Sequence, residues 1–255
     1  MSEAHGYGML IMVKMEKQFG IKTKQYFDGM FAYAKDHPSD INPSFMAWRQ
    51  YRQEDGTMVD DKNNGVTDSA TDGDMDIEYA LLLADQLWGS DGEINYKREA
   101  IKIINSLMGS VVNKDEWTLK LGDWVKNNNP KYGTASRTSD WMIGHISTFY
   151  DVTGDERWKK VLVRMIEMIT GIQDNFSPET GLLPDFVWKQ EGELIPVDGD
   201  FFGEQKGPYY SYNACRVPWR LADGYFITKD EKVKHQLEKM NTWIMENHTK
   251  YPFKN

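Results

Sequence analysis

Amphipathic segments of helical length recur along most of the chain and are separated by loops. Within each segment apolar residues lie three and four positions apart, the spacing of one helix face, and alternating strand patterns are almost absent. The expected helices are 6–19, 22–35, 72–88, 95–109, 136–150, 156–172, 209–225 and 229–247. We therefore expect an all-α fold, built as a bundle, a solenoid or a barrel of helical hairpins. The sequence contains no short repeat with fixed residues, which argues against the solenoid.

Three long connections interrupt this pattern. Residues 53–66 are rich in Gly, Asp and Asn and predict a loop or short hairpin. Residues 110–134 lose clean periodicity, and residues 189–208 form a long loop containing Gly, Pro and acids. Loops of this size in compact domains are usually functional.

Length and charge limit the function classes. With 255 residues, 40% of them hydrophobic, the chain has the material for one large domain, which we expect to span 1–255. The net charge of -9 argues against nucleic-acid binding, which requires a basic face. No apolar run reaches the roughly 18 residues of a membrane span, and residues 1–20 lack the layout of a signal peptide. Because the chain opens directly on motif-like sequence, we expect a leader and part of the fold to be missing.

The sequence gives little support for metal, cofactor or thiol chemistry. The five histidines are scattered without ligand spacing, and the acids at 72–76 lack the twelve-residue loop of a calcium site, so no metal or cofactor is expected. The single cysteine, Cys215, excludes an intrachain disulfide. Its surroundings predict a packed helical position rather than a catalytic thiol.

Five carboxylates gather within residues 68–78, where an apolar helical segment begins. Acidic side chains stabilise a helix N-terminus, and Thr71 or Asp72 is expected to be the N-cap. A single acid would indicate only a cap. Three aspartates at every second position exceed that need, and they are Asp72, Asp74 and Asp76. We interpret the stretch as part of a site.

Aromatic residues make up 13% of the chain, and several tryptophans stand beside charged residues rather than inside apolar runs. Examples are Trp48, Trp124 and Trp141. Such rings offer a flat apolar face for stacking on sugars. Carboxylates and aromatics together in loops fit glycoside hydrolysis, in which one acid protonates the glycosidic oxygen and a second carboxylate assists. A carbohydrate-binding protein without catalysis fits the same pattern.

Several motifs, in order along the chain, resemble those of glycoside hydrolase family 8, which includes endoglucanases, lichenases, chitosanases and xylanases. The matching segments are Ser2-Glu3-x-x-Gly6-Tyr7-Gly8-Met9, Ala70-Thr71-Asp72-Gly73-Asp74-Met75-Asp76-Ile77, Leu121-Gly122-Asp123-Trp124, Ser139-Asp140-Trp141-Met142 and Tyr212-Asn213-Ala214-Cys215-Arg216-Val217-Pro218. The resemblance implies an (α/α)6 barrel, here incomplete at both ends, and an inverting hydrolase.

The resemblance also implies roles for single residues. Glu3 corresponds to the general acid, and Asp72 to the acid that grips the distorted sugar in the central subsite. Trp48 and Trp124 correspond to stacking platforms. The remaining residues assigned to substrate binding are Asp140, Tyr210, Asn213 and Arg216.

One position departs from many members of the family. They carry Asp as the catalytic base where this chain has Asn213, and an amide cannot accept a proton at neutral pH. The chitosanase-glucanase subgroup has the same Asn and takes its base, a Glu, from the loop just upstream. The matching candidate here is Glu204, with Asp200 and Asp198 as reserves. An inverting mechanism requires about 6.5 to 9.5 Å between the two carboxyl groups, so that a water fits between them.

The substrate class follows from the same resemblance. We expect an endo-acting β-1,4-glycanase on chitosan, β-1,3-1,4-glucan (lichenan) or cellulose-type glucan. The many acids favour the cationic polymer slightly, since carboxylates pair with ammonium groups. The alternative is a non-catalytic or inactive truncated glycan-binding protein. A polymeric substrate implies secretion.

Overall fold

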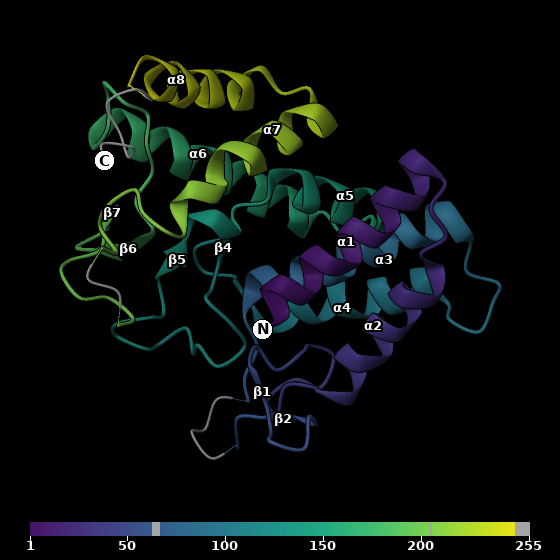
Figure 1. Cartoon of the computed structure of the whole chain (residues 1–255). Coiled ribbons are helices and arrows are strands. Elements are labelled where there is room, and N and C mark those ends of the chain that lie inside the picture. Colours follow the sequence, from purple (N-terminus) through teal and green to yellow (C-terminus); the bar gives the residue numbers. More distant parts are fainter. Residues whose placement is uncertain (63–66, 204–205, 248–255) are drawn as a thin grey trace, which may run out of the picture. The chain divides into compact units, whose positions relative to one another are not determined.

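The computed structural model describes residues 1–62, 67–203 and 206–247, and these contain eight α-helices (Figure 1). The expected all-α class is confirmed. The described chain divides into two compact units, the first made of residues 1–112 and 121–126 and the second of residues 113–120 and 127 onward. We describe each unit by itself.

The first unit is built from four helices and a small hairpin. The hairpin pairs β1 (Gln50–Arg52) with β2 (Met58–Asp60), as expected for this loop-rich stretch. Helix α3 packs against both α1 and α4, and α2 packs against α1. The helices are α1 (Ser2–Phe19), α2 (Lys24–Asp36), α3 (Thr71–Trp88) and α4 (Tyr96–Ser110).

Helices α1 and α3 approach each other through glycines (Figure 1). A Cβ added at Gly6 would lie 2.7 Å from the Cβ of Asp76, and one at Gly73 would lie 2.6 Å from the Cβ of Ser2. The start of α1 therefore meets the start of α3, and the next turn of α1 meets the next turn of α3. The two helices run in parallel, and their N-termini lie at the same end of the unit.

Helix α3 is buried over almost its whole first half, including its acidic residues. A helix surrounded on all sides by protein usually carries apolar residues all round, which makes these buried acids unusual. Because α1 and α4 cover α3, the acids are enclosed.

The second unit repeats the helix pairing and adds a small sheet. Helix α5 packs against α6 and α7, and α7 packs against α8. Strand β6 (Phe186–Gln190) lies between β5 (Ser136–Arg137) and β7 (Glu193–Pro196), antiparallel to both. The helices are α5 (Ile143–Thr153), α6 (Arg157–Asn175), α7 (Val217–Thr228) and α8 (Glu231–Asn247).

The connections differ from expectation in several places. Residues 136–142 form strand β5 and a 3-10 turn before α5, so the helix expected from 136 begins later. The expected loop at 189–208 contains the β6–β7 turn and strand β7. Helix α7 starts at Val217 rather than at residue 209, after the short 3-10 helix η3 (Ala214–Arg216). Short strands β3 (Val112–Asn113) and β4 (Thr118–Leu119) also pair within the aperiodic stretch.

Two helix ends show how local residues terminate a helix, and the second corrects an expectation. Gly20 ends α1 in the left-handed conformation, with φ 68°, and its N–H donates to the Glu16 carbonyl. The N-cap of α3 is Ala70, whereas Thr71 or Asp72 was expected. Asp72 lies inside the first turn instead, where its carboxylate still faces the positive end of the helix.

Within the described ranges, no helix is long and apolar enough to cross a membrane.

The close approach of α1 and α3 predicts that Gly73→Ala will destabilise the protein. The added methyl group would lie 2.8 Å from the backbone carbonyl carbon of Ser2, which cannot move without shifting α1. We expect a loss of about 1–3 kcal/mol, typical of overpacking, measured by urea unfolding. The control is Gly171→Ala in α6, where a Cβ would meet nothing within 4 Å. Because alanine favours helix, this control should gain about 0.5–1 kcal/mol. Equal stability of Gly73→Ala and the parent would contradict the analysis.

Candidate active site

Glu3 lies in the first turn of α1, partly exposed, where the helix dipole favours a negative charge. One turn later, the Tyr7 hydroxyl donates a hydrogen bond of 3.0 Å to Glu3 Oε1. The pair lies on one face because the two residues are four positions apart in a helix. Tyr7 therefore restrains the rotamer of the candidate acid.

Trp48 is joined by its backbone to the beginnings of both α1 and α3. Its carbonyl accepts a hydrogen bond of 2.9 Å from the Ser2 N–H, one of the donors that a helix N-terminus leaves without an intrahelical partner. Its own N–H donates to the Asp68 carbonyl at 2.9 Å. The Arg49 guanidinium lies 5.0 Å from the centre of the Trp48 ring and is paired with Asp61. One face of this partly exposed indole is therefore covered by a cation.

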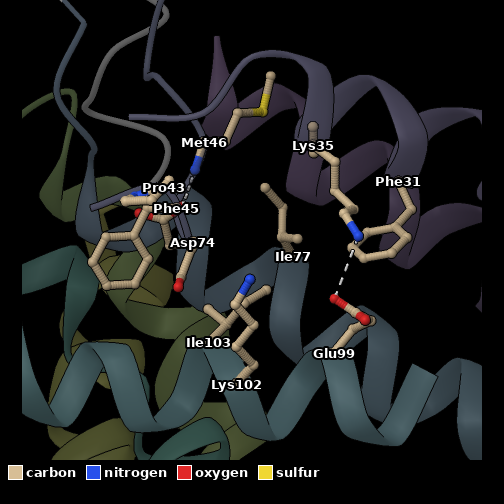
Figure 2. Close-up of a pocket in the computed structure, with 12 residues that line it drawn as sticks. Phe31, Lys35, Pro43, Phe45, Met46, Asp74, Ile77, Glu99, Lys102 and Ile103 are labelled. Carbon is tan, nitrogen blue, oxygen red and sulfur yellow. Dashed lines mark hydrogen bonds and ion pairs between the residues drawn. The ribbon is translucent and has the colours of Figure 1, made fainter. Parts of the chain in front are cut away.

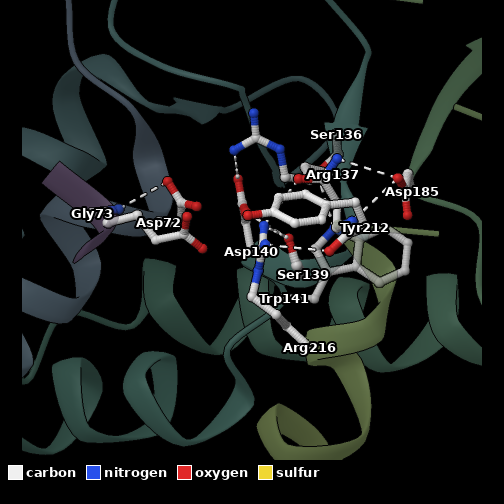
Figure 3. A network of polar contacts seen from close by, with 12 residues as sticks. Asp72, Gly73, Ser136, Arg137, Ser139, Asp140, Trp141, Asp185, Tyr212 and Arg216 are labelled. Atoms are coloured by element: carbon white, nitrogen blue, oxygen red, sulfur yellow. Dashed lines mark hydrogen bonds and ion pairs between the residues drawn. The ribbon is translucent and has the colours of Figure 1, made fainter. Parts of the chain in front are cut away.

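Asp72 is only 4% exposed, and its Oδ1 accepts a hydrogen bond of 2.9 Å from the Gly73 N–H (Figure 3). Since α1 and α3 run in parallel and begin together, the first unit carries Glu3 and Asp72 at the same end. The predicted gathering of these two acids is thus consistent with the packing of the unit.

Three further acids of α3, namely Asp74, Asp76 and Glu78, are buried. The sequence analysis placed their stretch in a site but assigned none of the three an individual role. Burial raises the pKa of Asp74 and Glu78 well above their usual values, and neighbouring carboxylates add to the effect. In the described part of the chain, neither carboxyl oxygen of Glu78 has a hydrogen-bond partner. Burial therefore favours the protonated form of both acids, since a carboxylate away from water loses its solvation.

Trp124 follows a glycine and an aspartate that hold its loop. A Cβ at Gly122 would lie 2.7 Å from the Trp124 ring nitrogen, so the glycine allows the indole to fold back on its own backbone. Asp123 accepts hydrogen bonds from the Ser39 hydroxyl at 2.6 Å and from the Ser69 N–H at 2.9 Å. The sequence analysis quoted Asp123 in a motif but missed this anchoring role.

In the second unit, Asp140 is 1% exposed and lies 3.6 Å from the Arg137 guanidinium (Figure 3). It also accepts a hydrogen bond of 3.2 Å from the Ser139 hydroxyl. This ion pair over three positions holds the charge of Asp140 within the 3-10 turn.

Asp185, which the sequence analysis missed, organises the turn that carries Asn213. Its carboxylate accepts hydrogen bonds from the backbone N–H groups of Ser211, Asn213 and Ala214 and from the Asn213 side-chain amide, at 2.7–3.2 Å. The sequence signal was weak: an acid lying between apolar residues just before a strand. The amide oxygen of Asn213 accepts from Arg216 at 2.9 Å, and Arg216 also donates to Ser139 at 3.1 Å (Figure 3). Asn213 and Arg216 thus belong to one hydrogen-bonded cluster.

Tyr210 lies beside this turn, and burial raises its pKa to about 12, with the charges of Cys215 and Asp185 adding to the effect. Its hydroxyl therefore keeps its proton at neutral pH. Cys215 is exposed, so the expectation that it is packed inside a helix was wrong. It lies in the short 3-10 helix η3, ahead of α7 rather than within it.

The candidate base Glu204 lies outside the described residues, and its role stays a prediction. The reserves Asp198 and Asp200 are exposed. In the ranges that are described, no group of three or more His, Cys, Asp or Glu residues is arranged to hold a metal ion.

Substituting Asp185→Asn should loosen the turn at 211–214. One of its oxygens would become an NH2 group facing backbone N–H donors, and we expect a loss of about 1–3 kcal/mol in urea unfolding. The matched control is Asp174→Asn, which removes an exposed pair with Lys239 at 3.4 Å and should cost less than about 0.5 kcal/mol. Equal effects of the two substitutions would count against the anchoring role.

A pH dependence is expected from Asp68, whose pKa is raised to about 6 by burial and by the charge of Asp123. Because the folded pKa exceeds the unfolded value near 4, this group favours folding most below about pH 4, and the contribution is lost as pH rises through 6. Asp68→Asn should therefore be more stable than the parent at pH 7, and the difference should shrink towards pH 4.

Urea unfolding of parent and variant at several pH values measures this difference. The control is Asp55→Asn, because hydrogen bonds from Thr57 lower the pKa of Asp55, so its variant must not show the same trend. A difference between Asp68→Asn and the parent that does not vary with pH would contradict the prediction.

Comparisons with known proteins identify the family of this chain. The chain matches the model of glycosyl hydrolases family 8 over residues 1–245. It is 45% identical to a beta-glucanase of Niallia circulans, covering 95% of this chain and 57% of that protein. It is 40% identical to an endoglucanase of Bacillus sp. (strain KSM-330), covering 95% of this chain and 50% of that protein. The chain thus spans about half the length of the curated relatives it matches.

A solved structure, the beta-1,3-1,4-glucanase from Paenibacillus sp.X4, is 42% identical, with a TM-score of 0.88 over 97% of this chain and 63% of that one. A cold-adapted family 8 xylanase, 19% identical with a TM-score of 0.76 over 98% of this chain and 60% of that one, shares the fold. The chain therefore belongs to glycosyl hydrolases family 8, and its paired helices are the all-α architecture expected of that family's (α/α)6 barrel.

Proposed function

We propose that this chain belongs to the catalytic region of an inverting, endo-acting β-1,4-glycanase. Its proposed main substrate is β-1,3-1,4-glucan. The observation that carries the proposal is the parallel start of α1 and α3. It brings to one end of a unit a tyrosine-held glutamate, Glu3, and a buried aspartate, Asp72. Membership of the family supplies the reaction class.

In the proposed reaction, Glu3 donates its proton to the glycosidic oxygen as the bond to the anomeric carbon breaks. Tyr7 holds the Glu3 carboxyl group in position. Asp72 accepts hydrogen bonds from the sugar as it distorts. A water attacks the anomeric carbon from the opposite face and gives a proton to the base, so the configuration inverts.

We assign the base to Glu204, as in the subgroup that carries Asn at the usual base position. The Asn213 side chain supports this assignment, because its amide donates to Asp185 and its oxygen accepts from Arg216. Both ends of the amide are engaged in fixing the turn, and an amide takes up no proton at neutral pH. The role left for Asn213 is to position its neighbours.

The substrate assignment rests on the relatives. Proteins 40% to 45% identical to this chain are named for β-glucan or endoglucanase activity. The solved relative at 42% identity is a beta-1,3-1,4-glucanase. Chitosan stays in the proposal as a second substrate, because buried and partly exposed acids can pair with glucosamine ammonium groups.

A glycan-binding protein without turnover is the second candidate function. It is favoured by the partly exposed rings of Trp48 and Trp124, which can stack on sugars without catalysis. In either case we propose that residues 1–255 act as a single domain on an extracellular polysaccharide.

The proposed acid and base are tested with Glu3→Gln and Glu204→Gln. Each variant should lose about 10²–10⁴-fold in reducing-sugar release from lichenan, because a carboxamide neither donates nor accepts the catalytic proton. Both should still bind cello-oligosaccharides, measured by tryptophan fluorescence or calorimetry. The matched control, Glu93→Gln, changes an exposed glutamate and should keep full activity. Full activity of Glu3→Gln would end the assignment.

Assays of the parent chain on lichenan, chitosan and carboxymethylcellulose, side by side, separate the candidates. Hydrolysis of any polymer with initial inversion at the anomeric carbon, followed by NMR, supports the enzyme. Binding without release of reducing ends supports the second candidate.

A further inference from the structure

The segment 45–48 runs across the start of α3 and carries Trp48. Backbone hydrogen bonds fix it on one side, where the N–H of Ala47 donates to the His37 carbonyl at 2.8 Å and the carbonyl of Phe45 accepts from Ser39 at 2.9 Å. This places Met46 opposite Pro38 in an antiparallel bridge. The Met46 N–H lies between those two bonds, so it points away from that ladder.

That buried N–H donates to Asp74 Oδ1 at 2.9 Å (Figure 2). Asp74 and Met46 are 2% and 3% exposed, so water does not compete for this bond. An unpaired backbone N–H in such a place is costly, and Asp74 supplies its partner from α3.

Two residues further along the segment, the backbone of Trp48 connects to the helix that carries the candidate acid. The Trp48 carbonyl accepts from the Ser2 N–H, directly before Glu3, and its N–H donates to the Asp68 carbonyl. A shift of the segment at Met46 would therefore move both the Trp48 ring and the first turn of α1.

From this arrangement we propose that Asp74 is a positioning residue for sugar binding: by accepting from Met46 it fixes the segment 45–48 and hence the placement of Trp48. The part that concerns sugar rests on the proposed function. The role requires an acceptor oxygen rather than a negative charge. Burial raises the pKa of Asp74 well above its usual value, in spite of the Met46 hydrogen bond, which favours the charged form.

The surroundings of Asp74 allow a discriminating pair of substitutions. A cavity of about 60 Å³ lies beside it, lined by Phe45, Ile77 and Ile103, with a Lys35–Glu99 ion pair at 3.6 Å nearby (Figure 2). Leucine fits this apolar wall without an acceptor, and asparagine keeps the acceptor at nearly the same shape. Leucine and asparagine therefore separate loss of the hydrogen bond from loss of volume.

The test compares Asp74→Leu, Asp74→Asn and the parent chain by amide hydrogen exchange of Met46 and by hydrolysis of lichenan. For Asp74→Leu we expect exchange at Met46 about tenfold faster and KM about tenfold higher, with kcat changed less than about threefold. Asp74→Asn should restore both values to within about threefold of the parent. Asp85→Leu, on the same helix but bonded to Ser90, is the control and should leave Met46 exchange unchanged.

The inference is overturned if Asp74→Leu leaves Met46 exchange and KM at parental values, or if Asp74→Asn is impaired as strongly as Asp74→Leu. Should Asp74→Leu fail to fold, Asp74→Ala replaces it against the same asparagine variant. If the parent hydrolyses no polymer, the proposed function fails. The exchange of Met46, together with oligosaccharide affinity by fluorescence, then still decides whether Asp74 positions Trp48.

Discussion

The contact between α1 and α3 through Gly6 and Gly73 is the constraint on which the first unit depends. A Cβ at either position would force the helices apart, because it would clash with side-chain and backbone atoms of the neighbouring helix. Close packing of two parallel helices also aligns their N-termini, so two positive dipole ends face the same region. Glu3 and Asp72 lie in the first turns of these two helices. The site's chemistry thus follows from a packing requirement.

A second set of acids is buried in the first unit, and its role is structural. The carboxyl groups of Asp74 and Glu78 are enclosed, with pKa values raised well above the usual range by burial, and Asp123 is bonded to Ser39 and Ser69. A neutral carboxyl group accepts a backbone hydrogen bond as an amide would, with no charge to desolvate. Acids on the same helix therefore divide by environment. Asp72 is the proposed sugar-binding acid, whereas Asp74 accepts a backbone hydrogen bond from Met46.

The sequence predicted the helices well, since periodicity reports which face is buried. It failed where backbone geometry is set by contacts distant in the chain. Strand β7 depends on its pairing with β6, and the late start of α7 depends on Asp185, more than 25 residues upstream, which holds the 211–214 turn. The burial of Asp74 could not be predicted either, because an aspartate is expected to be exposed when only its residue type is known. The roles of Glu3 and Asp72 stay predictions, and they rest on motif resemblance because periodicity carries no information about catalytic roles.

The division of the described chain into two units has a consequence for how such enzymes diversify. Residues 1–112 carry the proposed proton donor, whereas the proposed acceptor belongs to the sequence after residue 127. A substitution in the second unit can change the proposed acceptor, while the proposed donor Glu3 keeps its hydrogen bond from Tyr7 in the first unit. The proposed acid and base belong to different units, so substitutions can accumulate in one unit independently of the other. Substrate preference can then change without altering the unit that carries Glu3.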